Sequence, residues 1–329
     1  MLGKDIGIDL GTVNIVIYVK GEGIVLSEPS VVVIDEETKN PIAFGSEANE
    51  MLGRTPGKIK VVKPMRDGVI ADFEVMEVLL QYLLKKANVK SLFKPRIIIC
   101  CPSNITEVEK NAIREAAERT GAKRVFIEEE PKVAAIGAGM DISKPVGNMV
   151  VDIGGGTTDI AVLSLGNIVT SASIKTAGNT FDENIITYIK DKYKLLIGEK
   201  TAERIKTTIG VAQCNEKDNK DKMEVKGRDL IKGLPKTIKI SSDEICEALK
   251  DSVTKIINMV KVVLEQTPPE LSADIIEKGI VLTGGGALLN RLPDLMEKEL
   301  EAPVFIADDP LKCVAEGTGI LLDKLNYVD

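Results

Sequence analysis

Two short stretches of the chain share one pattern of apolar and polar positions. In the first stretch, an apolar strand pattern leads into the turn residues 9–12, and the apolar run 15–19 follows. In the second stretch, a strand pattern leads into residues 152–158, and the apolar run 160–165 follows. Each pattern predicts a β-hairpin whose tight turn carries an aspartate, glycines and hydroxyl groups. Because the copies open the first and second halves of the chain, they predict duplicated α/β domains that face each other across a cleft.

Two capping boxes predict where long helices begin. Thr106 with Glu109, and Ser241 with Glu244, place a hydroxyl three residues before a glutamate and just ahead of apolar residues at helical spacing. Since each side chain can accept a hydrogen bond from the other residue's backbone amide, this pattern is typical of a helix start. We therefore expect one helix from residue 106 onward and a second, longer helix from residue 241 onward.

Two other stretches break the alternation of strands and helices. Residues 33–65 hold turn residues and short strand patterns, whereas residues 183–240 are charged, then helical, then hairpin-like. Within the second stretch, residues 214–222 are rich in charge and predict an exposed loop. We interpret both stretches as insertions into the two duplicated domains.

Composition removes several classes of chemistry. The 329 residues include no histidine and no tryptophan, so imidazole nucleophile systems and histidine-bound zinc or iron are excluded. Any catalysis must use carboxylates, lysines, hydroxyls, backbone amides or a hard metal bound through oxygen. An aromatic share of 3% and a net charge of -7 argue against nucleic acid as a partner.

The cysteines and the hydropathy indicate the compartment. Cys100, Cys101, Cys214, Cys246 and Cys313 are odd in number and form no C-x-x-C pair. We expect them to be reduced and mostly buried, as in a cytoplasmic protein. No apolar run approaches the roughly 18 residues that a membrane-spanning helix needs.

Three glycine-rich turns point to phosphate binding. Residues 9–12, 152–158 and 283–286 each combine glycines, which let backbone amides approach a phosphate, with hydroxyl donors. Asp9 and Asp152 end their strands, so we expect them to face each other across the cleft and to hold a hydrated Mg²⁺. The chain has no P-loop motif, and its first two glycine turns lead into strands, which disfavours a Rossmann dinucleotide fold.

Together these motifs carry a resemblance to a known family. The chain resembles the MreB/Mbl family of bacterial actin homologues, and it is closest to the Mbl branch. The resemblance covers essentially the whole chain. The motifs that carry it for the family are 8–12, 53–57, 67–71, 129–131, 151–158, 227–229, 233–235, 267–271 and 282–287, and those that favour the Mbl branch are 100–102, 128–135 and 157–159.

The resemblance implies a fold, an activity and partners. It implies an α/β actin-like fold of two duplicated ribonuclease-H-like domains around a nucleotide cleft, and a slow Mg²⁺-dependent ATPase. It also implies homopolymeric double protofilaments in the cytoplasm, associated peripherally with the inner face of the membrane, that guide cell-wall elongation proteins and maintain rod shape. The implied subdomains are IA (1–32, 66–140 and 310–329), IB (33–65), IIA (141–182 and 241–309) and IIB (183–240).

The resemblance also implies which residues bind the nucleotide. The implied contacts are Thr12, Val13 and Asn14 in the first phosphate loop, Gly154, Gly155, Gly156 and Thr157 in the second, Glu203, Arg204, Ile205 and Lys206 at the ribose and base, and Gly285, Gly286, Ala287 and Leu288 at the adenine and phosphates.

Two carboxylates are candidates for handling the attacking water. Glu130 precedes Pro131 at the position where the resemblance places a water-orienting residue, and a carboxylate there can accept a proton or align the water. The alternative is that residues 128–130 form a solvated acidic strand end that favours a helix N-terminus. Asp159 is the second candidate, although its side chain is one methylene shorter than the glutamate common in MreB.

Membrane contact is predicted at one loop. Leu92 and Phe93 are large apolar residues among lysines and an arginine, which suits insertion into an anionic surface. The alternative is that both side chains cover the core between two elements; the resemblance favours insertion.

Two other functions share the phosphate loops of such a fold. A small-molecule kinase would need a substrate pocket with a catalytic aspartate, and the sequence shows no sugar- or acid-binding motif. A chaperone-type ATPase is the other alternative. Sedimentation with ATP and Mg²⁺ separates them, because a filament pellets whereas a kinase stays monomeric.

Overall fold

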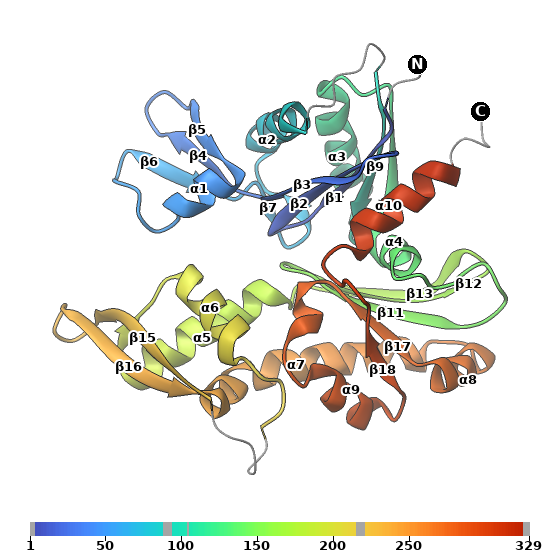
Figure 1. The fold of residues 1–329 in the computed structure, drawn as a ribbon. Helices are drawn as coiled ribbons and strands as arrows, with labels where there is room; N and C mark the ends of the chain where they lie inside the picture. Colours follow the sequence, from blue (N-terminus) through green and yellow to red (C-terminus); the bar gives the residue numbers. More distant parts are fainter. Residues whose placement is uncertain (1–3, 88–93, 104, 215–220, 325–329) are drawn as a thin grey trace.

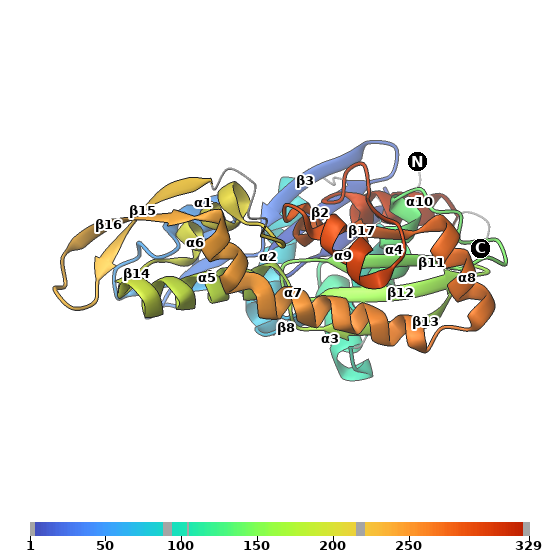
Figure 2. The same ribbon diagram turned by 90° about the horizontal axis from the view of Figure 1, so that it is seen from below.

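The computed structural model of the chain describes residues 4–87, 94–103, 105–214 and 221–324. In this part of the chain, the elements form two large α/β domains, one above the other in Figure 1, and each carries a smaller sheet on the same side. The 90° view shows that the molecule is flat, with the small sheets at one end (Figure 2).

The first domain is built on a mixed five-stranded sheet. Its strand order is β10-β9-β1-β2-β3, with β9 parallel to β1 and to β10 and with antiparallel pairs at β1–β2 and β2–β3. The strands are β1 (Ile6–Leu10), β2 (Asn14–Val19), β3 (Gly23–Pro29), β9 (Arg96–Cys101) and β10 (Arg124–Glu129).

The second domain repeats this arrangement. Its strand order is β13-β12-β11-β17-β18, with antiparallel pairs at β11–β12 and β12–β13 and parallel pairs at β11–β17 and β17–β18. Each sheet therefore has a central hairpin strand with an antiparallel neighbour on one side and a parallel neighbour on the other, which confirms the predicted duplication. The strands are β11 (Asn148–Ile153), β12 (Thr158–Ser164), β13 (Asn167–Ile174), β17 (Ile280–Thr283) and β18 (Val304–Ile306).

Both predicted capping boxes start helices. The Glu109 carboxylate accepts a hydrogen bond from the Thr106 amide at 2.7 Å, and the Thr106 hydroxyl accepts one from the Glu109 amide at 3.2 Å. The Glu244 carboxylate likewise accepts from the Ser241 amide at 2.9 Å. These caps open α3 (Glu107–Arg119) and the 24-residue α7 (Ser242–Glu265). The remaining helices of the large domains are α2 (Phe73–Lys86), α4 (Glu130–Gly137), α8 (Pro269–Lys278), η1 (Gly285–Leu288), α9 (Leu292–Leu300) and α10 (Cys313–Lys324).

The two stretches interpreted as insertions form the small sheets. The first holds a three-stranded sheet and also a short helix, α1, that the sequence did not predict; the second combines helices with a hairpin, as expected. The predicted boundaries of the four subdomains stay a prediction. The elements of these stretches and their flanks are β4 (Val32–Asp35), β5 (Pro41–Phe44), α1 (Gly45–Met51), β6 (Ile59–Val62), β7 (Met65–Arg66), β8 (Val69–Ile70), α5 (Gly178–Tyr193), β14 (Leu195–Leu196), α6 (Glu199–Ile209), β15 (Lys222–Asp229) and β16 (Pro235–Ser241).

Helices α4 and α10 join the two domains. Side chains from both helices and from both large sheets share one buried apolar cluster, so this helix pair lies between the sheets (Figure 1). Two glycines allow α4 and α10 to pack closely. A Cβ on Gly137 would lie 1.8 Å from the Cys313 carbonyl oxygen, and a Cβ on Gly317 would lie 2.1 Å from the Val133 carbonyl oxygen. Glycine is required there because any side chain would push the helices apart.

Candidate functional site: the cleft between the domains

A cavity of about 880 Å³ opens between the two domains. Both hairpin turns line its floor, η1 and the loop after it line one wall, and α5 and α6 line another. Its size suits a ligand of nucleotide dimensions, since small-molecule pockets usually measure roughly 300–1,000 Å³.

The two hairpin turns touch each other at the floor of the cleft. A Cβ built on Gly155 would lie 2.1 Å from Val13 Cγ2, and one built on Gly156 would lie 2.5 Å from Thr12 Oγ1. Both distances are far below van der Waals contact, so only glycine allows this approach. The predicted phosphate loops are thus brought together from residues more than a hundred positions apart in the sequence.

The third glycine turn packs against the strand end that leads into the second turn. Gly284 has φ +78°, and a Cβ there would lie 2.4 Å from the Ile153 carbonyl oxygen. Since non-glycine residues rarely adopt this backbone region, the turn needs glycine for conformation and for space. It leads into the short 3₁₀ helix η1, and α9 begins after η1 at Leu292.

Helix α5 begins against the second turn. The Gly178 amide donates to the Gly154 carbonyl at 3.1 Å, and the Asn179 amide donates to the Gly155 carbonyl at 2.8 Å. The positive end of the helix dipole therefore points toward the turn predicted to hold phosphate, and it favours negative charge there.

Four carboxylates lie beneath the turns: Asp152, Glu130 and Asp159 are buried, and Asp9 is half-buried. Burial, together with Asp152, raises the pKa of Asp9 to about 7. Burial also raises the pKa of Asp152 to about 7, although Thr283 opposes the shift by donating its hydroxyl to Asp152 Oδ1 at 2.8 Å. Burial raises the pKa of Glu130 well above its usual range, and Asp159, Asp9 and Asp152 add to the rise.

This cluster fits a divalent cation. Carboxylates that repel one another in a low-dielectric site are stabilised by a bound positive charge, which favours their ionised form. Asp9 and Asp152 both line the cavity, as predicted for a Mg²⁺ site. Among the described residues no three metal-ligating side chains converge, and the assignment of Asp9 and Asp152 to Mg²⁺ stays a prediction.

Glu130 and Asp159 occupy different positions. Glu130 begins α4, lines the cavity and is 8% exposed, so the alternative of a solvated acidic strand end is wrong for this residue. Asp159 pairs with Asp152 across the β11–β12 ladder and is fully buried, outside the set of residues that line the cavity. Its carboxylate accepts a hydrogen bond from the Ser103 amide of the other domain at 3.1 Å. The catalytic role of both residues stays a prediction.

Most, but not all, of the predicted nucleotide contacts line the cavity. Glu203 and Lys206 line the cavity on one face of α6, whereas Ile205 is buried in the core. This alternation follows from helical periodicity, because positions three and four apart share a face. Of the predicted nucleotide contacts, the cavity is lined by Thr12, Val13, Asn14, Gly154, Gly155, Gly156, Thr157, Glu203, Lys206, Gly285, Gly286 and Leu288, and not by Arg204, Ile205 or Ala287.

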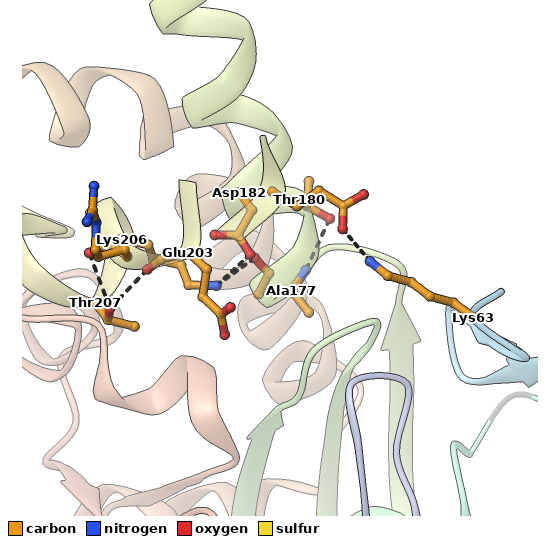
Figure 3. Close-up of polar contacts among 10 residues, drawn as sticks. Lys63, Ala177, Thr180, Asp182, Glu203, Lys206 and Thr207 are labelled. Atoms are coloured by element: carbon orange, nitrogen blue, oxygen red, sulfur yellow. Dashed lines mark hydrogen bonds and ion pairs between the residues drawn. The ribbon is translucent and has the colours of Figure 1, made fainter. Parts of the chain in front are cut away.

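Two ion pairs in the cleft were not foreseen from the sequence. Lys206 Nζ donates to Asp182 Oδ2 at 2.9 Å and to the Gly178 carbonyl at 3.1 Å, which fixes the lysine on the α5–α6 wall. Lys63, which follows β6, reaches across the cleft and binds the carboxylate of Glu199 at the start of α6. Figure 3 shows Lys63 approaching from the opposite side to Asp182 and Lys206. These residues come from distant segments and carry no local motif.

The expectation that all five cysteines are reduced is wrong for two of them. Cys214 and Cys246 form a disulfide with a Cα–Cα distance of 6.1 Å, and Cys214 also lines the cavity. The sequence spacing gave no signal for this pair, because the fold brings the loop after α6 against α7. Cys100, Cys101 and Cys313 are free and buried, as expected.

The predicted membrane residues cannot be placed. Leu92 and Phe93 lie outside the described residues. Within the described part of the chain, no helix combines the length and apolar character required to cross a bilayer.

The duplicated sheets, the cleft between them and the two hairpin turns at its floor define an actin-like protein. Solved structures agree with this fold. MreB5 of Spiroplasma citri bound to AMPPNP matches with a TM-score of 0.94 at 43% identity, over 98% of this chain and 97% of that one. A MamK double helical filament matches with a TM-score of 0.81 over 97% and 98% of the two chains; at 23% identity it supports the fold alone.

The chain belongs to the MreB/Mbl family. A family profile described as MreB/Mbl protein matches residues 3–329. The cell shape-determining protein Mbl of Bacillus cereus is 60% identical over 99% of this chain and 98% of its own length. The cell shape-determining protein MreB of Escherichia coli is 51% identical over 99% of this chain and 95% of its own length. The greater similarity to Mbl agrees with the branch predicted from the motifs.

Proposed function

We propose that this protein binds ATP with Mg²⁺ in the cleft, hydrolyses it slowly and assembles into filaments. The observation that carries the proposal is the floor of the cleft, where two glycine turns from duplicated domains meet above Asp9 and Asp152. Relatives support it, since the S. citri MreB5 structures contain AMPPNP and ADP.

Different residues of the cleft would bind the phosphates, the metal ion, and the ribose and base. Backbone amides of the two turns and the N-terminal end of α5 would receive the phosphates. Asp9 and Asp152 would hold hydrated Mg²⁺, which would supply positive charge against the phosphates and the carboxylate cluster. Lys206 and Glu203 line the wall where the resemblance places ribose and base.

Glu130 would handle the attacking water. Its side chain lines the cavity next to the carboxylate cluster and is held at the start of α4. In its ionised form it can accept a hydrogen bond, or a proton, from water. Slow turnover is expected where a carboxylate positions the water, and slow hydrolysis suits an ATPase that times filament assembly.

Assembly would couple this chemistry to cell shape. We propose homopolymeric double protofilaments on the inner face of the cytoplasmic membrane, attached through Leu92 and Phe93, which guide cell-wall elongation proteins and maintain rod shape. The support is the family, whose members include cell shape-determining proteins. The cytoplasmic location and the membrane attachment are part of this proposal.

Sedimentation tests the proposed function. The purified protein should pellet with ATP and Mg²⁺ and stay in the supernatant without nucleotide, and phosphate should be released from the pelleted fraction. A persistent monomer whose turnover is stimulated by a small-molecule acceptor would instead support the kinase alternative. A monomer stimulated by an unfolded peptide would support the chaperone alternative.

A further inference from the structure

A disulfide fastens one part of the cavity wall to the core of the second domain. Cys214 follows the end of α6 and lines the cavity, and it is bonded to Cys246 in the second turn of α7. Helix α7 packs into the buried apolar cluster through Ile245 and Leu249, on either side of Cys246 in the sequence. The bond therefore cross-links a lining residue of the cleft to a helix that is held by the core.

The segment that leads to Cys214 is also held on its other side. The Ala212 amide donates to the Asn290 carbonyl at 2.8 Å, and Val211 forms an isolated β-bridge with the same residue. Asn290 follows η1, which carries predicted contacts with the nucleotide. Residues 210–214 thus run from α6 between η1 and α7, and most of them line the cavity. The disulfide is the covalent anchor of this part of the wall.

The bond can be reached by small thiols through one of its two sulfurs. Cys214 is exposed, whereas Cys246 is only 9% exposed. Thiol–disulfide exchange begins when a thiolate attacks an accessible sulfur, so Cys214 is the point of attack. In the cytoplasm, the location proposed above, lasting disulfides are rare and those that form are usually transient, as in redox sensing. An exposed bond in the wall of a binding cleft fits that role.

We propose that Cys214 and Cys246 form a reversible redox site that sets the affinity of the cleft for nucleotide. In oxidation, the Cys214 thiolate attacks a low-molecular-weight disulfide and displaces one thiolate, and the Cys246 thiolate then attacks the Cys214 sulfur and displaces the second. The two protein thiols lose two electrons and two protons, and the small disulfide takes them up to become two thiols. Reduction is the reverse exchange. This inference rests on the proposed nucleotide function.

The direction of the effect follows from where the wall becomes ordered. With the bond in place, residues 213–214 are fixed before the nucleotide arrives. Without the bond, this end of the segment must be ordered as the nucleotide binds, which costs conformational entropy. The reduced protein should therefore bind ADP with Mg²⁺ about tenfold more weakly than the oxidised protein, a factor that corresponds to ordering about one residue of backbone.

Calorimetric titration with ADP and Mg²⁺ after treatment with oxidised glutathione or with dithiothreitol tests the inference. Thiol titration of the unfolded protein, in the same samples, should give three free thiols after oxidation and five after reduction. Cys246→Ala removes the bond without changing a residue that lines the cavity. This variant should bind ADP like the reduced wild-type protein after either treatment.

A matched control and the contrary outcomes complete the test. Cys101→Ala removes a buried free cysteine and should keep the redox response of the wild-type protein. The inference is overturned if oxidised glutathione leaves five free thiols, if the oxidised and reduced wild-type proteins bind ADP equally, or if Cys246→Ala still responds to the treatment. Absence of ADP binding in both redox states would contradict the proposed function, and the inference with it, even where the thiol titration shows the bond.

Discussion

The contact between the two glycine turns can be tested by adding one methyl group. In Gly155→Ala the new Cβ would lie 2.1 Å from Val13 Cγ2, whereas carbon atoms normally approach to about 3.5–4.0 Å. The turns must therefore separate by roughly 1.5 Å, and overpacking of this kind costs about 1–3 kcal/mol. If that cost falls on the closed, ligand-binding cleft, affinity for Mg²⁺-ATP should drop roughly 5- to 150-fold.

A second substitution should partly restore binding. Val13→Ala removes the methyl group nearest to the new Cβ but leaves the Cβ of residue 13 at 2.9 Å, so the double variant should regain part of the lost affinity. Isothermal titration calorimetry of the four proteins gives the coupling energy between the sites, and thermal unfolding checks that each variant is folded. Losses that simply add in the double variant, or normal affinity of Gly155→Ala alone, would refute the proposed contact between the turns.

Three further predictions concern hydrolysis, pH and the membrane. Glu130→Ala should slow phosphate release by about 10²–10⁴-fold with nucleotide affinity nearly intact, and unchanged turnover would show that another group positions the water. The raised pKa of Asp152 means that the nucleotide-free protein loses stability as pH rises from below 4 through about 7; Asp152→Asn should remove this part of the loss, so its melting temperature relative to the wild type should increase between pH 5 and pH 8. The same variant should bind Mg²⁺-nucleotide more weakly. Changing Leu92 and Phe93 to Ser should abolish co-sedimentation with anionic liposomes but preserve polymerisation, and unchanged binding would discard the membrane prediction.

The sequence predicted the parts of the fold that have a local signature. The hairpin-and-glycine pattern was repeated in both halves, so it revealed the duplication and the two glycine turns that meet in the cleft. The capping boxes located α3 and α7 because the box depends on residues three apart. The short helix α1 was missed, since its N-cap residue Phe44 makes no side-chain cap.

The cleft was predictable only in part, for physical reasons. Consecutive residues of a helix point in different directions, so the block from Glu203 to Lys206 could not all face one ligand, and Ile205 lies in the core. Asp182 and Lys63 act through partners that are distant in sequence, and only the folded chain brings these groups together. The disulfide between Cys214 and Cys246 was unpredicted for the same reason.

The central claim is that nucleotide turnover in the cleft serves polymerisation. The most direct test measures phosphate release and pelletable protein in the same samples over a range of protein concentrations, with ATP and Mg²⁺. We predict that both rise together above a single critical concentration. Turnover per molecule that is constant at all concentrations, with no pelletable polymer, would contradict the account.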